Sequence, residues 1–530
     1  MKRKVWFKKK SLALVLVLLL LFSGCAKKAA EVSPAPSARQ IYGNSTTVSF
    51  DESLAKTESG AEFNTEDYKY IAGNRFFESI NTPLSTFSID VDTASYSNIR
   101  RFISSGEKPP QDAVRIEEMI NYFTYDYPQP EGNMPFSITR EVGECPWNGK
   151  HKLVMLGLQG KKLETDVKLK NNLVFLMDVS GSMQDPDKLP LLKSAFKMMV
   201  NQLGEKDKVS IVVYAGSAGM VLEPTSCSNK DKILAAIEGL EAGGSTAGGE
   251  GILLAYKTAK QSFIDGGNNR VILATDGDFN VGVSSEGDLT RLIEQKRQEG
   301  IFLTVLGFGT GNLKDSKMEM LADKGNGNYA YIDSLFEAKK VLVNEIGSTL
   351  YTIAKDVKLQ IEFNPVKVKA YRLVGYENRV MNKEDFNDDR KDAGDLGAGH
   401  SVTAFYEIIP AGSDEKTAGV DQLQFQQVSL KDSNDWMNVK LRYKLPEAEE
   451  SQLLVQSITE KDYNVEGSGN FRFAAAVAEF GLLLRDSEYK GSASFESVLS
   501  NAREAKGDDR EGYRVEFIKL VETASALFGR

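Results

Sequence analysis

The sequence predicts a multi-domain α/β protein in which a doubly wound, mostly parallel sheet is flanked by a β-sandwich and helical modules. Short apolar runs rich in β-branched residues alternate with amphipathic helical stretches between about residues 173 and 354, as in a doubly wound sheet. Strict alternation of apolar and polar residues follows at 356–363 and 436–443, which is typical of half-buried antiparallel strands. The length of 530 residues exceeds what one hydrophobic core can organise.

The N-terminus has the features of an export signal. The basic segment 1–10 is followed by an apolar stretch from Leu12 to Phe22, which suits a signal peptide and is shorter than a membrane-spanning helix. The stretch ends in Phe22-Ser23-Gly24-Cys25. This end resembles the lipobox of bacterial lipoproteins, although leucine is usual where Phe22 stands. We expect residues 1–24 to be a signal peptide and Cys25 to be lipidated, which anchors the chain on the extracytoplasmic face of the cell membrane. A signal-anchor helix is the alternative.

Two segments precede the α/β domain. Residues 25–73 are rich in Ser, Thr, Glu and Ala and are expected to form a flexible tether. Residues 74–166 are expected to form an N-terminal module with two helices and two strands. The helices are expected at 92–106, capped by Asp92 or Thr93, and at 112–123; the strands at 135–142 and 151–160.

The α/β domain is expected at 167–355. Its buried strands are expected at 172–178, 208–215, 270–276 and 301–309, and its helices at 189–203, 230–240, 249–264 and 289–300. A last helix at about 334–354 leads directly into the strand at 356–363.

The C-terminal half is expected to contain two further modules. Residues 356–446 are β-rich, with strands at 356–363, 400–409 and 436–443. We expect them to form one sandwich with the strands from 135–160, so that the α/β domain is an insertion. Residues 447–530 are expected to be helical, with helices at 471–485 and 513–527.

Charge and cysteine content limit the function. The formal net charge is −9, which argues against a nucleic acid partner because phosphate contacts need basic surface. Beyond Cys25 only Cys145 and Cys227 remain, which is too few for a disulfide framework. Isolated thiols are the simpler interpretation and a bridge between them is the alternative.

Five residues on three loops form a candidate metal site. They are Asp178, Ser180, Ser182, Thr246 and Asp276. All offer oxygen, which suits a hard cation such as Mg²⁺ better than Zn²⁺ or Cu²⁺. Asp178 and Asp276 end predicted parallel strands, the edge at which such sheets bind ligands. The alternative is that Ser180 and Ser182 only cap a helix.

The order and spacing of these motifs resemble the von Willebrand factor type A domain, a Rossmann-like fold with a metal-ion-dependent adhesion site. The resemblance implies that Ser180 and Ser182 bind the metal directly, that Asp178 and Asp276 bind it directly or through water, and that Thr246 joins when a ligand is engaged. It also implies Mg²⁺, or Mn²⁺, as the cofactor and an Asp or Glu of a partner protein as the ligand.

The flanking segments resemble a bacterial lipoprotein family built around this domain. The segments 85–98, 113–123 and 144–148 resemble the N-terminal module of that family, and the β-rich and helical part resembles its C-terminal module. The resemblance extends from about Asn74 to Arg530.

Several enzyme motifs are incomplete. The run Asp90 to Thr93 misses the DxDxT spacing by one residue, and no GxxxxGK[ST] loop is present, so neither an aspartyl phosphatase nor a nucleotide partner is expected. The chain has two histidines, His151 and His400, which excludes an HExxH metalloprotease. Both are expected on the surface or on edge strands.

The sequence therefore favours a membrane-anchored, extracytoplasmic, metal-dependent protein-binding protein that is not an enzyme. An envelope assembly or chaperone-like factor is the alternative. A metal-dependent hydrolase is less favoured, since its general base would have to be Glu250 or Asp278, and neither has independent support.

Overall fold

The computed structural model describes residues 64–162, 169–244, 248–277, 285–417, 419, 424–425 and 429–529. These residues belong to one unit of the chain, Glu62–Arg530. The expected signal peptide, Cys25, Thr246 and Asp278 lie outside the described residues. None of the helices in the described ranges is both long and apolar enough to cross a membrane.

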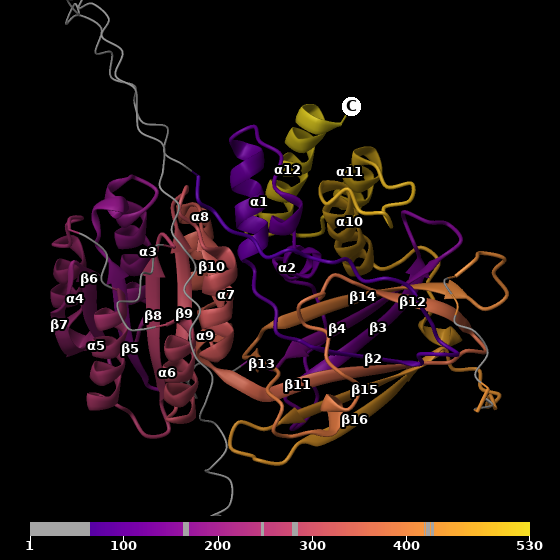
Figure 1. Ribbon diagram of the computed structural model, residues 1–530, viewed down its shortest axis with the longest axis horizontal. Coiled ribbons are helices and arrows are strands. Elements are labelled where there is room, and N and C mark those ends of the chain that lie inside the picture. Colours follow the sequence, from indigo (N-terminus) through magenta and orange to yellow (C-terminus); the bar gives the residue numbers. More distant parts are fainter. Residues whose placement is uncertain are drawn as a thin grey trace, which may run out of the picture. The chain divides into compact units, whose positions relative to one another are not determined.

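A six-stranded sheet forms the centre of the α/β domain, in the order β10-β9-β8-β5-β6-β7 (Figure 1). Its strands are β5 (Asn171–Asp178), β6 (Lys208–Ala215), β7 (Ser217–Ser226), β8 (Asn268–Thr275), β9 (Ile301–Phe308) and β10 (Tyr329–Ile332). All neighbouring strands are parallel except β6 and β7. The predicted doubly wound, mostly parallel sheet is confirmed.

Helices cover both faces of this sheet. They are α3 (Leu189–Gln202), α4 (Lys230–Glu238), α5 (Gly248–Gln261), α6 (Glu286–Gln298) and α7 (Asp315–Lys324). One face packs against α3 and α4, and the other packs against α5, α6 and α7. Burial on both faces explains the largely apolar strand sequences. The strands β7 and β10 and the helix α7 were not predicted from the sequence. The strand β7 was missed because it is a partly exposed edge strand and lacks an apolar run.

Two antiparallel sheets form a β-sandwich beside the α/β domain. One has the order β1-β12-β14-β4-β3 and the other the order β13-β11-β15-β16, with β2 paired to β11. The strands are β1 (Phe77–Glu78), β2 (Leu84–Ser88), β3 (Phe136–Glu144), β4 (Lys152–Gly160), β11 (Thr352–Phe363), β12 (Val368–Val374), β13 (Gly394–Gly397), β14 (Ser401–Pro410), β15 (Met437–Lys444) and β16 (Gln452–Ile458). Both sheets contribute to one core, with Val154 and Tyr406 from the first and Ile361 and Val439 from the second.

The α/β domain is inserted into this sandwich. The strands β3 and β4 precede it in the chain, yet β4 pairs with β14, which follows it; Met155 lies opposite Phe405. The strands expected at 135–160 therefore lie in the same sheet as two strands of the β-rich module.

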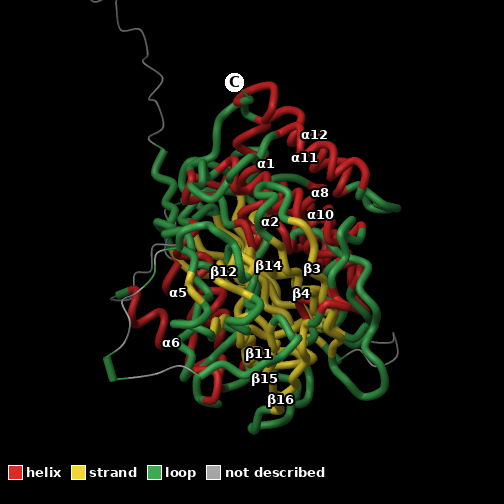
Figure 2. Tube along the Cα trace, turned by 90° about the vertical axis from the view of Figure 1, so that its right-hand side faces the viewer, coloured by secondary structure: helices red, strands yellow, loops and turns green. Residues whose placement is uncertain are grey.

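A helical layer covers the outer face of the sheet that contains β4 and β14 (Figure 2). The helices α10 (Gly469–Leu484), α11 (Phe495–Glu504) and α12 (Tyr513–Phe528) share an aromatic-rich core with α1 (Ala94–Ser104) and α2 (Ile116–Asn121). The ring of Phe471 fills the space at Gly143 of β3, where a Cβ atom would come within 2.6 Å of it. A side chain at position 143 would therefore push α10 off the sheet.

The helix expected at 334–354 is broken, and this prediction was wrong. The helix α8 (Leu335–Lys339) passes into a π-helical turn (Lys340–Asn344), and α9 (Ile346–Leu350) ends before β11. Lys340 is buried, and its ammonium pairs with Glu345 at 2.5 Å and lies 4.3 Å from the centre of the Tyr122 ring. The wider turn brings Lys340 and Glu345, five positions apart, into contact.

The expected side-chain cap of the helix at 92–106 is also wrong. Thr93 is the N-cap residue of α1, but its side chain makes no capping bond. The Asp92 carboxylate instead accepts a hydrogen bond of 2.7 Å from the backbone N–H of Tyr329. Asp92 is buried beside Arg379, so its carboxyl group makes contacts between modules rather than at the helix end.

Asp92 belongs to a buried group of charges that we call the junction cluster. Its cations are Arg115, before α2, and Arg379, after β12. Its acidic members are Asp90, Asp92, Glu118, Asp315, Glu319 and Asp323. Arg115 pairs with Glu118 and Asp315, and Arg379 pairs with Glu319 at 2.9 Å and with Asp323. The cluster therefore joins the N-terminal module, α7 of the α/β domain and the sandwich.

Burial raises the pKa of Asp92 well above its usual range, and the nearby carboxylates of Asp323 and Asp90 raise it further, while Arg379 opposes the shift. Burial likewise raises the pKa of Glu118, against the favourable charge of Arg115. The carboxylates outnumber the guanidiniums, so each arginine is needed to keep several buried charges paired.

His151 is buried, contrary to the expectation of a surface or edge-strand position. Its Nδ1 lies 2.5 Å from Glu407 Oε1 and its Nε2 lies 2.9 Å from Glu415 Oε2. Glu407 also pairs with Arg372. Burial lowers the pKa of His151, but the two glutamates outweigh it and the net pKa is raised. His400, in contrast, has its pKa lowered by burial.

Cys145 and Cys227 are free and buried, so the isolated-thiol interpretation holds and the alternative of a bridge is excluded. Burial raises the pKa of Cys227 to about 11 and raises that of Cys145 further. Both thiols are therefore inert in the folded chain.

Replacing Arg379 by Met should lower the free energy of unfolding by about 3–5 kcal/mol, because buried carboxylates lose their partner. The measurement is the midpoint of urea unfolding followed by circular dichroism. Arg390→Met is the matched control, since the Arg390 side chain is 88% exposed. Equal midpoints for the two variants would contradict a stabilising role of the junction cluster.

The raised pKa of His151 predicts a pH dependence. A group with a raised pKa stabilises the folded state fully below its unfolded pKa, about 6.5 for histidine, and loses this contribution as the pH rises through the folded value. The wild type should therefore lose stability from about pH 6 upwards, and His151→Gln should flatten this loss in pH-dependent urea unfolding. His400→Gln is the control; if it flattened the loss as much, the assignment to His151 would fail.

Candidate metal site

The two aspartates of the predicted site lie at the same edge of the central sheet. Asp178 is the last residue of β5, and Asp276 follows the end of β8. The two strands are adjacent and parallel, with Met177 opposite Ala274. Both aspartates are 0% exposed. The structure thus brings together the carboxylates that lie far apart in the sequence.

The first loop places two hydroxyls beside Asp178. The backbone N–H of Ser180 donates to Asp178 Oδ1 at 2.9 Å, and Thr275 Oγ1 donates to Asp178 Oδ2 at 3.3 Å. The hydroxyls of Ser180 and Ser182 lie 3.0 Å apart. Ser180 precedes a short 3-10 helix (Gly181–Gln184), but its side chain makes no capping bond, which removes the support for the helix-cap interpretation of this serine.

The second loop is held against the first by backbone hydrogen bonds. Gly243 N–H donates to Val179 O at 2.8 Å, and Gly181 N–H donates to Gly244 O at 3.0 Å. Thr246 follows two residues later and lies outside the described residues. The bonds place the start of its loop next to the serines.

The site is electrostatically strained without a cation. Burial raises the pKa of Asp178 to about 6; the charge of Asp276 raises it too, while hydrogen bonds from Ser180 lower it. The negative charge of a neighbouring carboxylate thus disfavours the ionised form of Asp178, and a bound cation would reverse this effect.

A lysine that the sequence did not single out reaches into the site. Lys188 Nζ lies 3.2 Å from Asp276 Oδ2, and the lysine side chain is buried. Its aliphatic stem crosses Gly309, where a Cβ atom would come within 2.4 Å of Lys188 Cε. Gly309 has φ +71°, so glycine meets both the backbone and the space requirement. The Lys188 ammonium thus places a positive charge from the chain itself beside Asp276.

Comparison with known proteins identifies the family. Three family models match consecutive parts of the chain: von Willebrand factor at 62–155, the von Willebrand factor type A domain at 172–345, and the C-terminal part of the uncharacterized protein YfbK at 348–527. The uncharacterized protein YfbK of Escherichia coli (strain K12) is 42% identical over 486 residues, which are 89% of this chain and 83% of that protein. The chain belongs to the YfbK family.

Other relatives share a smaller part. The uncharacterized protein sll0103 of Synechocystis is 31% identical over 186 residues, 34% of this chain and 42% of that protein. Among solved structures, a von Willebrand factor type A protein from Catenulispora acidiphila is 17% identical, covers 74% of this chain and 91% of its own, and has a TM-score of 0.39. BatB from Bacteroides thetaiotaomicron is 24% identical, covers 33% of this chain and 97% of its own, and has a TM-score of 0.29. The expected von Willebrand factor type A domain is confirmed by the family model.

The described residues of this YfbK-family site fit a hard divalent cation. Asp178, Ser180, Ser182 and Asp276 offer carboxylate and hydroxyl oxygens at one edge of the sheet, and the two buried carboxylates need positive charge. Mg²⁺ prefers such oxygen ligands and retains some of its water. These four residues would hold the ion from the described loops.

Two other acidic features of this family member fit a metal or a catalytic base less well. Three buried carboxylates of the junction cluster, Asp92, Glu118 and Glu319, come within 4.8 Å of one another, but Arg115 and Arg379 already pair with them. The bases considered for a hydrolase are no better placed: Glu250 is exposed in the first turn of α5, and Asp278 lies outside the described residues.

Lys188→Met should raise the affinity for Mg²⁺ or Mn²⁺ by about tenfold, because the ammonium competes for Asp276 with an incoming cation. The same change should lower the stability of the metal-free chain by about 3 kcal/mol, since Asp276 loses a buried partner. Titration calorimetry and urea unfolding measure the two effects.

The matched control is Lys193→Met, because Lys193 lies on the next turn of the same segment and donates to the backbone oxygens of Glu238 and Leu240 instead. An unchanged or weaker metal affinity in Lys188→Met would show that the lysine does not oppose the metal.

Proposed function

We propose that this YfbK-family protein is a lipid-anchored, extracytoplasmic binding protein that uses Mg²⁺, or Mn²⁺, to capture an acidic side chain of a partner protein. The observation that carries the proposal is the convergence of Asp178, Ser180, Ser182 and Asp276 at the carboxyl edge of the sheet. Thr246 is proposed as the fifth ligand, contributed by the loop that begins at Gly243.

The chemistry of the donors supports capture rather than catalysis. When bound, the cation supplies an electrophilic position that an acceptor oxygen can occupy. The neutral hydroxyls of Ser180 and Ser182 hold it without cancelling its charge, so the charge of the ion is balanced only by the two aspartates. An incoming Asp or Glu of a partner then adds the remaining negative charge.

The chain's own groups position this site. The hydrogen bonds from Ser180 N–H and Thr275 Oγ1 fix both oxygens of the Asp178 carboxylate. Lys188 neutralises part of the charge of Asp276 until a divalent ion takes the place of the Lys188 ammonium. The sequence up to Cys25 supports attachment to the membrane through lipid, and the acidic balance of the chain supports a protein rather than a nucleic acid as partner.

A pull-down from membranes tests this function. The wild type should retain a partner in Mg²⁺ and lose it in EDTA, whereas Asp178→Ala should fail to retain it in either condition, because a metal ligand is missing. Mass spectrometry of the eluates measures retention. Metal-dependent contacts of this kind usually contribute several kcal/mol, so the loss should exceed about tenfold.

Asp231→Ala controls for the loss of one negative charge, since Asp231 is exposed on α4, away from the candidate ligands. A partner retained equally by wild type and Asp178→Ala, with and without EDTA, would refute metal-dependent capture.

A further inference from the structure

A polar cavity lies at the opposite end of β8 from the candidate metal site. Its volume is about 300 Å³, which is in the range of small-molecule sites. Arg270 near the start of β8 lines it. The chain advances about 3.3 Å per residue along a strand, so the cavity lies about 20 Å from Asp276. It is therefore separate from the candidate metal site.

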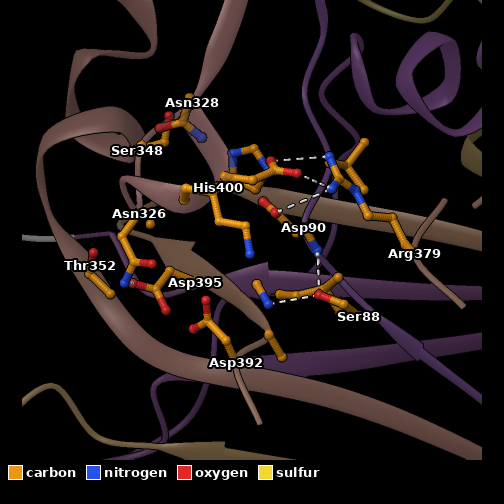
Figure 3. A pocket seen from close by; sticks show the side chains of 18 of the residues that line it. Ser88, Asp90, Asn326, Asn328, Ser348, Thr352, Arg379, Asp392, Asp395 and His400 are labelled. Atoms are coloured by element: carbon orange, nitrogen blue, oxygen red, sulfur yellow. Dashed lines mark hydrogen bonds and ion pairs between the residues drawn. The ribbon is translucent and has the colours of Figure 1, made fainter. Parts of the chain in front are cut away.

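The N-terminal module, the α/β domain and the sandwich all contribute to the walls of this cavity (Figure 3). The segment 88–91 comes from the N-terminal module, residues 323–328 come from the end of α7, and residues 392–400 come from the sandwich around β13. Neutral polar side chains make up much of the wall, among them Asn326, Asn328, Ser348 and Thr352. Figure 3 shows Asn326 and Asp395 between the pair Asn328 and Ser348 and the rim residue Asp392.

Most charges on the wall are paired within the protein. Arg379 pairs with Asp323 and lies 3.7 Å from Asp90. Asp392 pairs with Arg297. Lys324 lies 3.2 Å from Glu294. Each of these groups therefore has an ion-pair partner within the described chain.

Arg270 is the exception among the cations of the wall. It is 2% exposed, donates one hydrogen bond of 2.8 Å to Thr304 Oγ1, and makes no ion pair within the described residues. Its Nε is buried without a hydrogen-bond partner. Burial lowers its pKa to about 10. A buried guanidinium with an unused donor is energetically unfavourable unless an acceptor completes it.

Asp395 is the corresponding exception among the anions. It accepts long hydrogen bonds from Asn326 Nδ2 at 3.4 Å and from the backbone N–H of Asp356 at 3.3 Å. No cation of the described chain lies within ion-pair distance of it. Its field favours the charged form of Arg270, so the two groups are near each other without touching.

We propose that this cavity binds a free amino acid, with the ligand carboxylate on Arg270 and the ligand ammonium on Asp395. Among the described residues of the wall, Arg270 is the guanidinium without a carboxylate partner and Asp395 is the carboxylate without a cationic partner, and a small zwitterion matches both. A simple anion would be repelled by Asp395 and the neighbouring carboxylates, and a divalent cation would be repelled by Arg270. The neutral hydroxyls and amides of the wall can hydrogen-bond a small polar side chain.

The site does not depend on the metal-dependent function. Because its walls come from three modules, a bound amino acid would hold them together and stabilise the folded chain by mass action.

The test starts from the purified full chain and the twenty free L-amino acids. Thermal shift should single out at least one of them, and titration calorimetry should then show 1:1 binding. Acetate and methylamine, which each carry one of the two charges, should not bind at the same concentration. Arg270→Gln and Asp395→Asn should each weaken binding by at least about tenfold, the effect of losing one charge-assisted hydrogen bond.

Two controls separate this result from other causes. Arg503→Gln removes an exposed arginine of α11 and should leave binding unchanged. Asp178→Ala should also leave it unchanged, whereas it should abolish partner capture, so the two proposals fail independently. Asp395→Asn is isosteric and lies at the cavity wall, so it remains informative if Arg270→Gln does not fold.

Three outcomes would overturn the proposal. The first is that none of the twenty amino acids binds at about 10 mM. The second is that acetate, methylamine or Ca²⁺ binds as well as the amino acid. The third is that binding persists unchanged in both Arg270→Gln and Asp395→Asn.

Discussion

Arg115 and Arg379 neutralise buried carboxylates that come from the N-terminal module and from α7, while Arg379 itself belongs to the sandwich. Hydrophobic burial is not directional, so it could pack these three parts in several ways. A buried carboxylate without a nearby guanidinium is costly, so these ion pairs favour an arrangement that keeps the carboxylates beside the two arginines. Arg115 and Arg379 therefore help to fix the position of the α/β domain relative to its neighbours.

The junction cluster also borders one of the two ends of β8. At the carboxyl end, Asp276 lies near Asp178 and beside Lys188. At the other end, Arg270 faces the junction with the sandwich, where Arg379 closes part of the cavity wall. The candidate metal site and the polar cavity thus lie at opposite ends of one strand.

Local patterns in the sequence were sufficient for four strands of the central sheet, β5, β6, β8 and β9, and for the positions of Asp178 and Asp276, because these aspartates end apolar runs that form buried strands. Interactions between residues far apart in the chain could not be predicted from local sequence patterns. No feature of the sequence near Arg379 indicates that it pairs with Glu319, and none near His151 indicates that it contacts Glu407. Lys188 was missed because a lysine before a helix usually faces solvent, and only Gly309, far along the chain, makes room for it. The broken helix at Lys340 has the same cause, a buried charge whose partners are set by the tertiary fold.

The insertion of the α/β domain into the sandwich affects the order of folding during synthesis. The strand β4 leaves the ribosome long before β14, which pairs with it through contacts such as Met155 to Phe405. The intervening domain has local strand-helix units and can fold as soon as it emerges. Until β14 is made, β4 presents an apolar face and an unpaired edge. The nascent chain is therefore most prone to aggregate in this interval, and a chaperone that covers a β-edge would be most useful there.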